Sequence, residues 1–188
     1  MNVLEALHTR RAVRDYQNRP VDAVTIDRLL HAAVLAPSAM NSQPWRFIVI
    51  QDAARLKRYS DLAKANLLAD AAQHAKTEHY RALLGTPEFN IFYNAGTLVT
   101  IGVETRGPFS EADAWLAAGN LMLAACEAGL GSCSIGFALG VLNTPEVKQE
   151  LQIPPEGYAL APILLGYPTV QPPLVPRAEP RIWSWLRR

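Results

Sequence analysis

Residues 36–50, APSAMNSQPWRFIVI, join the end of a helical pattern to an apolar run typical of a strand. Between the two, residues 37–44 are polar but carry no charge, although an ordinary surface loop would be expected to contain Lys, Glu or Asp. Such neutral donors and acceptors suit a heterocycle edge or a polyol chain. For Ser38 or Asn41 taken singly, an Asx-type turn that only caps the helix is an equal alternative. The whole nonapeptide 37–45 favours a ligand.

Composition limits the class of protein before any motif is considered. The 188 residues fit one domain spanning 1–188, and 49% hydrophobic with 19% charged residues is a globular composition. A net charge of +1 provides no electrostatic footprint for nucleic acid. No apolar run is long enough to cross a membrane, and residues 1–10 lack the apolar core of a signal peptide. We therefore expect a cytoplasmic protein with neither a nucleic-acid nor a membrane partner.

The cysteines and histidines predict no metal site. Cys126 and Cys133 are seven residues apart, which fits neither a redox pair nor a zinc half-site. Two buried free thiols are the preferred interpretation. The four histidines show no metal-ligand spacing.

The hydrophobic pattern predicts strands separated by long helices, which indicates an α+β or α/β fold. We expect a short helical segment at 3–8, helices at 21–36 and 111–131, one or two helices at 53–84, and strands at 46–50, 97–103 and 158–168. The continuous apolar run at 46–50 predicts burial on both faces. The helix at 111–131 is apolar nearly all round, so it belongs in the centre of the domain or in a subunit interface, and Gly129 or Gly131 ends it.

A basic cluster follows the first helical segment. RRAVRDY (residues 10–16) places Arg10, Arg11 and Arg14 within five residues, and guanidinium groups bind phosphate through paired donors. Arg10 and Arg14 lie on one side if the segment is helical. A solvated basic turn is the alternative. Near the other terminus, either Arg177 or Arg181 could complete a phosphate clamp, or both are exposed charges of a Pro-rich tail.

The glycine-rich stretch GLGSCSIGF (residues 129–137) is not a dinucleotide fingerprint, because its glycines follow a helix rather than a strand. It predicts a helix C-cap followed by a small-residue loop at 132–136, whose backbone can approach a flat ligand closely. Pure capping is the alternative.

In this order, the pieces resemble the nitroreductase family of FMN-dependent oxidoreductases, with this chain as a short member. RRAVRDY and PSAMNSQPWRFIVI resemble its two N-terminal motifs, and NLMLAACEAGLGSCSIG and LLGYP resemble its central helix and last strand. The resemblance implies an α+β, nitroreductase-like three-layer sandwich. A mixed, mostly antiparallel sheet would be flanked by helices, with the long central helix at a homodimer interface. The tail, about 170–188, would wrap the partner subunit.

The resemblance also implies an FMN site between two subunits. Its cofactor-binding residues would be Arg10, Arg11, Ala12, Arg14, Pro37, Ser38, Ala39, Met40, Asn41, Gln43, Ser134, Ile135, Gly136 and Arg177.

The family implies a different role for each group. Arg10, Arg14 and Arg177 would hold the phosphate, while Arg11 and the Ala12 backbone would contact the flavin. Residues 38–41 would reach it from the partner chain, and residues 134–136 would bring backbone N–H groups near flavin N5.

The activity that the resemblance implies is a ping-pong transfer of hydride from NADPH or NADH to an electron-poor small molecule, such as a nitroaromatic or a quinone. No catalytic side chain is assigned, because the flavin carries the chemistry. The alternative is a flavin-binding store or sensor without nicotinamide turnover. The aromatic stretch FNIFYNA at 89–95 would line the substrate entrance or belong to the core.

Overall fold

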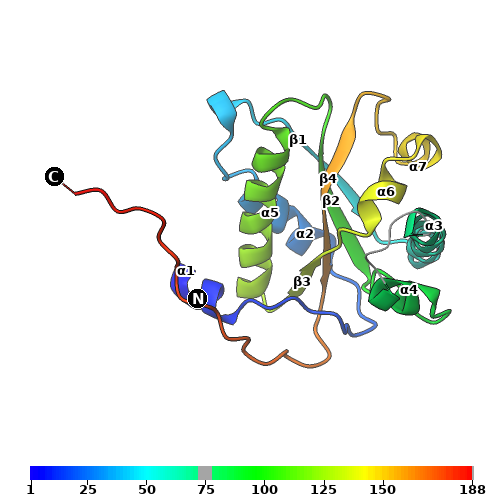
Figure 1. Cartoon of the computed structure of the whole chain (residues 1–188), viewed down its shortest axis with the longest axis horizontal. Helices are drawn as coiled ribbons and strands as arrows, with labels where there is room; N and C mark the ends of the chain where they lie inside the picture. The colour runs from blue at the N-terminus through cyan, green and yellow to red at the C-terminus, as the bar shows by residue number, and fades with distance from the viewer. Residues whose placement is uncertain (72–77, 188) are drawn as a thin grey trace.

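The computed structural model of the chain describes residues 1–71 and 78–187. A central sheet separates two helical layers (Figure 1), which confirms the α+β three-layer arrangement. The helices are α1 (Val3–Thr9), α2 (Ala23–Ala33), the 3-10 helix η1 (Ala39–Asn41), α3 (Ala53–Ala71), α4 (Glu78–Gly85), α5 (Ser110–Glu127), α6 (Ala138–Leu142) and α7 (Pro145–Glu150). The strands are β1 (Trp45–Ile50), β2 (Thr97–Val103), β3 (Gly131–Ser134) and β4 (Tyr158–Gly166).

The sheet has the order β1-β2-β4-β3, and each neighbouring pair is antiparallel. The mixed character expected of the sheet is limited to an isolated parallel bridge between Ala12 and Ser132. Strands β2 and β4 are buried along nearly their whole length, as central strands covered on both faces should be. Helices α2 and α5 cover one face of the sheet, and α3, α4, α6 and α7 lie on the other (Figure 1).

The expected burial of the first strand on both faces is wrong. Strand β1 is an edge strand, with Arg46 exposed and the Val49 side chain 40% exposed. An apolar run indicates that a segment packs somewhere, but it does not indicate how completely the helical layers cover its two faces at the edge of the sheet.

The loop expected at 132–136 is also corrected, because its first part is strand β3. Helix α5 ends at Glu127, and Gly129, with φ of 74°, reverses the chain, which confirms one of the two expected end points. The chain then pairs with β4 from Gly131 onward. A side chain at Gly131 would clash with Val13, its Cβ lying 2.6 Å from the Val13 Cγ2 atom. Glycine therefore lets the 10–16 segment lie directly against β3.

The two predicted long helices are present. Asp22 caps α2 by accepting a hydrogen bond of 2.8 Å from the Thr25 N–H. Helix α5 packs on the sheet through mostly small side chains, Ala114, Ala117, Ala118, Leu121 and Ala125. Its opposite side keeps Leu116 48% exposed. The pattern at 53–84 becomes α3 and α4, and residues 72–77 of that range lie outside the described residues.

Candidate cofactor site

The basic segment runs beside the glycine-rich strand. After α1, the chain is extended, and the Val13 N–H donates to the Ser132 carbonyl over 3.0 Å. Ala12 forms the bridge to the same serine. The Tyr16 hydroxyl, which is buried, donates to the Val13 carbonyl over 2.7 Å and fixes the segment from its other end. Two motifs that are more than 100 residues apart in the sequence are thus adjacent.

A cavity of about 420 Å³ opens where these motifs meet. It is lined by Arg14, Leu83, Ile91, Tyr93, Cys133, Ser134, Ile135, Gly136 and Phe137. Four of the residues expected to bind a cofactor therefore share this cavity: Arg14, Ser134, Ile135 and Gly136.

The cavity wall offers an unused backbone donor. The Ile135 N–H is bonded to the Pro162 carbonyl at 3.0 Å. The Gly136 N–H has no acceptor among the residues that the structure describes. No atom lies within 4 Å of the position that a Cβ of Gly136 would occupy, so a ligand can approach this backbone closely. The expected backbone contact is therefore available from Gly136 rather than from Ile135.

Two arginines bring positive charge to the same place. In the described parts of the chain, the guanidinium groups of Arg10 and Arg14 form neither a hydrogen bond nor an ion pair. The Arg14 Cζ atom lies 5.9 Å from the ring centroid of Tyr93. Burial raises the pKa of the Cys133 thiol, and the charges of Arg14 and Arg10 oppose that shift. Arg14 lines the cavity, whereas Arg10 does not.

Arg11 is placed differently from its two neighbours. Its Nη1 atom donates to the carbonyls of His8 and Arg10, at 2.7 and 2.6 Å, and its Nε atom donates to Pro173 at 3.3 Å. It caps the end of α1 and binds the C-terminal tail. Arg177 lines a separate cavity of about 420 Å³ together with Arg11. Within one chain, the structure thus groups Arg177 with Arg11 and not with Arg14.

The neutral loop at 37–43 is stabilised by its own hydrogen bonds. The Ser38 Oγ atom accepts from the Gln43 N–H at 2.9 Å, and the Gln43 amide donates to the Asn41 side chain at 3.2 Å. These bonds hold the loop together but do not form the Asx-type cap of the alternative interpretation, since Ser38 makes no side-chain cap hydrogen bond. Met40, Asn41 and Gln43 have positive φ angles, and the Met40 side chain is 98% exposed. Pro37 is exposed as well.

The neutral loop lies at the opposite end of α5 from the basic segment (Figure 1). The Ala39 N–H donates to the Asp113 carboxylate in the first turn of α5, at 3.0 Å. At the other end, the Thr9 hydroxyl lies 3.4 Å from the Cys126 sulfur. An 18-residue helix is about 27 Å long. One chain therefore does not bring residues 37–43 to the cavity beside Arg14.

The expectations for the thiols and for the aromatic stretch have mixed outcomes. Both cysteines are free, but only Cys133 is buried, because Cys126 lies on the partly exposed side of α5.

Within the stretch 89–95, Phe92 is fully buried in the core whereas Tyr93 lines the cavity. Tyr93 was not singled out from the sequence. Its only local signal is the pair of asparagines that flank it, since Asn90 and Asn94 are residue types that favour tight turns.

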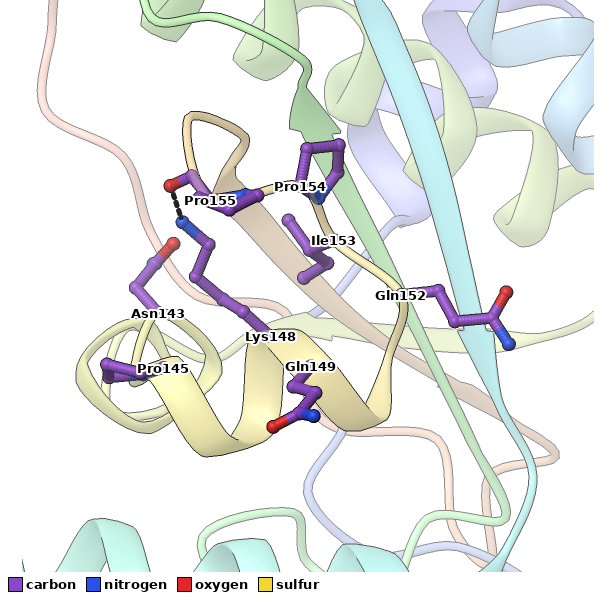
Figure 2. A pocket seen from close by; sticks show the side chains of 8 residues that line it. All are labelled: Asn143, Pro145, Lys148, Gln149, Gln152, Ile153, Pro154 and Pro155. Atoms are coloured by element: carbon purple, nitrogen blue, oxygen red, sulfur yellow. Dashed lines mark hydrogen bonds between the residues drawn. The ribbon is translucent and has the colours of Figure 1, made fainter.

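A larger cavity, of about 560 Å³, lies beside α7 (Figure 2). The Lys148 ammonium donates to the Pro155 carbonyl there. The Asn143 side chain is paired with Ala159 in both directions, at 3.0 and 2.9 Å. None of the residues expected to bind a cofactor lines this cavity.

Among the described helices, none is both long enough and apolar enough to cross a membrane.

The model of the nitroreductase family matches residues 7–167. The chain belongs to this family. It is 32% identical to the 5,6-dimethylbenzimidazole synthase of Rhodospirillum rubrum, over 95% of this chain and 87% of that protein. It is 29% identical to the FMN reductase (NAD(P)H) of Bacillus subtilis, over 93% of this chain and 69% of that protein.

A solved structure agrees with the sequence comparison. The nitroreductase with bound FMN from Bacteroides fragilis superposes with a TM-score of 0.80 at 25% identity, covering 99% of this chain and 98% of that chain. The fold expected from the resemblance is thereby confirmed.

Proposed function

We propose that the protein is an FMN-dependent oxidoreductase that transfers hydride from NADPH or NADH to an electron-poor small molecule, by a ping-pong mechanism. The observation that carries this proposal is the cavity lined by Arg14 and Gly136, both with free donors, together with the unpaired guanidinium group of Arg10 four residues before Arg14. All three residues lie in the part of the chain that matches the nitroreductase family.

The cavity fits FMN in charge and in size. Guanidinium groups with unspent donors bind a phosphate dianion through charge-assisted hydrogen bonds. The volume of about 420 Å³ is within the usual range of small-molecule sites. Leu83 and Ile91 provide an apolar wall for a flat ring system. When bound, the flavin supplies the hydride chemistry, and the chain supplies binding, orientation and electrostatics.

In this proposal, each residue of the site has a separate role. Arg10 and Arg14 hold the phosphate, and the Gly136 N–H donates to the edge of the ring system. Ser134, exposed at the end of β3, adds a polar contact beside it. Arg177 would complete the phosphate clamp only after the tail moves away from Arg11.

We also propose that the site is completed in a homodimer, in which residues 37–43 of one subunit reach the flavin held by the other. The support is the length of α5, which separates this loop from the cavity of its own chain. Large apolar side chains are exposed on the loop, on α5 and on the tail, which extends away from the domain in Figure 1. They are Met40, Leu116, Ile182, Trp183, Trp185 and Leu186. A second chain that covers these side chains would remove apolar surface from water.

The first experiment asks whether the purified protein carries FMN and whether NADPH or NADH bleaches it under anaerobic conditions. Reoxidation by a quinone and by a nitroaromatic should then restore the yellow colour in a separate step. A protein that cannot be loaded with FMN would refute the proposal. Tight FMN binding without bleaching would instead support a flavin store or sensor.

The acceptor has to be measured, because the relatives carry different activities in their names, a synthase in one case and a reductase in the other. The dimer is tested by dilution: as sedimentation shows subunits separating, flavin should be released. A demonstrated monomer that keeps its full complement of flavin would contradict the shared site.

A further inference from the structure

Among the described residues, the Arg14 guanidinium group forms no hydrogen bond or ion pair, and its Cζ atom lies 5.9 Å from the ring centroid of Tyr93. We infer that Tyr93 is a positioning residue, which holds Arg14 by a cation–π contact so that its N–H groups remain free for the phosphate of FMN. This inference rests on the proposed function.

A comparison of Arg14 with Arg11 shows why the kind of support matters. Arg11 is held by three carbonyls, and each of these bonds uses an N–H group that can no longer bind a ligand. An aromatic ring attracts a cation through its quadrupole, so a guanidinium group beside the ring keeps the N–H groups at its own edge free. Tyr93 can therefore restrict the Arg14 side chain without using the donors that an oxyanion needs.

The backbone around Tyr93 is unusual in a way that supports this role. Tyr93 has a φ angle of 50°, in a region that residues other than Gly, Asn and Asp rarely adopt. The next residue, Asn94, has a φ angle of 55°. Such outliers persist only where the surroundings determine them, and they gather at functional sites. The turn serves to aim the Tyr93 ring at the cavity.

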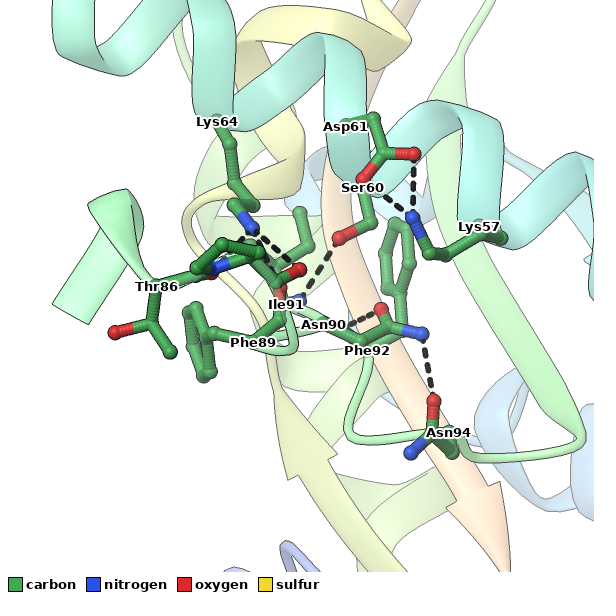
Figure 3. Close-up of polar contacts among 11 residues, drawn as sticks. Lys57, Ser60, Asp61, Lys64, Thr86, Phe89, Asn90, Ile91, Phe92 and Asn94 are labelled. Atoms are coloured by element: carbon green, nitrogen blue, oxygen red, sulfur yellow. Dashed lines mark hydrogen bonds and ion pairs between the residues drawn. The ribbon is translucent and has the colours of Figure 1, made fainter.

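Asn90 closes this turn (Figure 3). Its side chain donates to the Asn94 side chain at 2.9 Å and accepts from the Phe92 N–H at 2.9 Å. The Asn90 carbonyl also accepts from the Tyr93 N–H at 2.8 Å. The turn is thus closed by side-chain and backbone bonds of the same residue.

Helix α3 anchors the turn from behind. The Ser60 hydroxyl accepts from the Ile91 N–H at 3.0 Å, and the Lys64 ammonium donates to the carbonyls of Thr86 and Phe89, at 2.7 and 2.9 Å (Figure 3). Ser60 and Lys64 are buried. The Phe89 ring packs against the Tyr93 ring at 5.7 Å in an edge-on arrangement. Contacts from α3 therefore hold the segment that leads into the Tyr93 turn.

The test compares FMN with riboflavin, which has the same ring system but no phosphate. Both are titrated into the full-length protein, freed of bound flavin by dialysis, and binding is followed by flavin fluorescence. Tyr93→Leu should weaken FMN binding about fivefold, the effect expected for loss of one cation–π contact, and should leave riboflavin binding unchanged. Tyr93→Phe, which keeps the ring, should bind both ligands like the wild type.

Coupling to Arg14 provides the second readout. In an Arg14→Met background, Tyr93→Leu should cause no further loss of FMN affinity, because the group that Tyr93 positions is gone. Tyr93→Asn removes the ring but tolerates a positive φ angle, and it replaces Tyr93→Leu if circular dichroism shows that the leucine variant is unfolded.

Several results would overturn the inference. Equal losses for FMN and riboflavin would mean that Tyr93 contacts the flavin ring, and unchanged FMN affinity in both ring-less variants would mean that Arg14 needs no support. In both cases wild-type flavin loading would leave the proposed function standing. A wild-type protein that binds no FMN would overturn both.

Discussion

The cavity beside Arg14 and the cavity beside α7 differ in whether their charged side chains are already hydrogen-bonded. In the larger cavity, the Lys148 ammonium and the Asn143 amide are bonded to backbone groups of their own surroundings. In the smaller one, the Arg14 guanidinium and the Gly136 N–H have no hydrogen-bond partner among the described residues. Arg14 and Gly136 are both exposed, so their donors face the open cavity and are available to a ligand. The Gln149 and Gln152 amides of the larger cavity also lack hydrogen-bond partners among the described residues, but they are neutral. An unpaired positive charge, rather than volume, therefore distinguishes the candidate site.

The largest expected effect comes from removing both free guanidinium groups. Arg10→Met combined with Arg14→Met should raise the Kd for FMN at least about a hundredfold, because each charged hydrogen bond contributes about 1.5–3 kcal/mol. Fluorescence titration measures it. Lys148→Met, at the larger cavity, is the matched control and should bind FMN like the wild type. Equal losses in the two proteins would invalidate the distinction between the cavities.

The wall of the smaller cavity can be tested through Lys64. Lys64→Met should lower the free energy of unfolding by about 2–3 kcal/mol, because buried carbonyls that accept from its ammonium lose their donor. Urea denaturation measures this change. Lys57→Met is the control, since its pair with Asp61 is exposed and should contribute below about 0.5 kcal/mol. Similar losses for both lysines would show that the buried contacts add nothing.

Arg11 tests whether a guanidinium group that is already hydrogen-bonded within the protein also contributes to FMN binding. Arg11→Met should change the Kd for FMN by less than about threefold, because its donors already bind the backbone of α1 and the tail. It should cost about 1 kcal/mol in unfolding free energy, a typical value for lost internal hydrogen bonds. A loss of FMN affinity as large as that of Arg14→Met alone would place Arg11 in the site.

The smallest effect on FMN affinity is expected for Glu150 of α7, whose carboxylate binds Arg58 and Tyr59 of α3. Hydrogen bonds from Arg58 and then from Tyr59 lower the pKa of Glu150. The contribution of this carboxylate to stability is therefore present above its ordinary pKa of 4.5 and disappears as the pH falls through the lowered value. In thermal unfolding, the wild type should have a higher melting temperature than Glu150→Gln at pH 7, and this difference should vanish under acid conditions. FMN affinity at pH 7 should be equal in both, whereas a loss would link α7 to the flavin site.

Local patterns predicted most of the elements in this protein. The helical pattern at 21–36 contains α2, and Gly129 marks the end of α5, because helical spacing and caps depend on groups a few residues apart. Strand β3 was missed since GSCS has no apolar alternation, and it is a strand only because β4 pairs with it. The incomplete burial of β1 was missed for the same reason, because its place at the edge is a property of the whole sheet.

The candidate site divides in the same way. The sequence by itself determined which residue types are available: three arginines within five residues, a loop without charges and a run of small residues after a helix. Only the tertiary structure distinguished Arg11, bound to three carbonyls, from Arg14, which rests against Tyr93. The physical reason is that a side chain's chemistry is local, whereas the partners that use or spare its donors come from distant segments packed beside it.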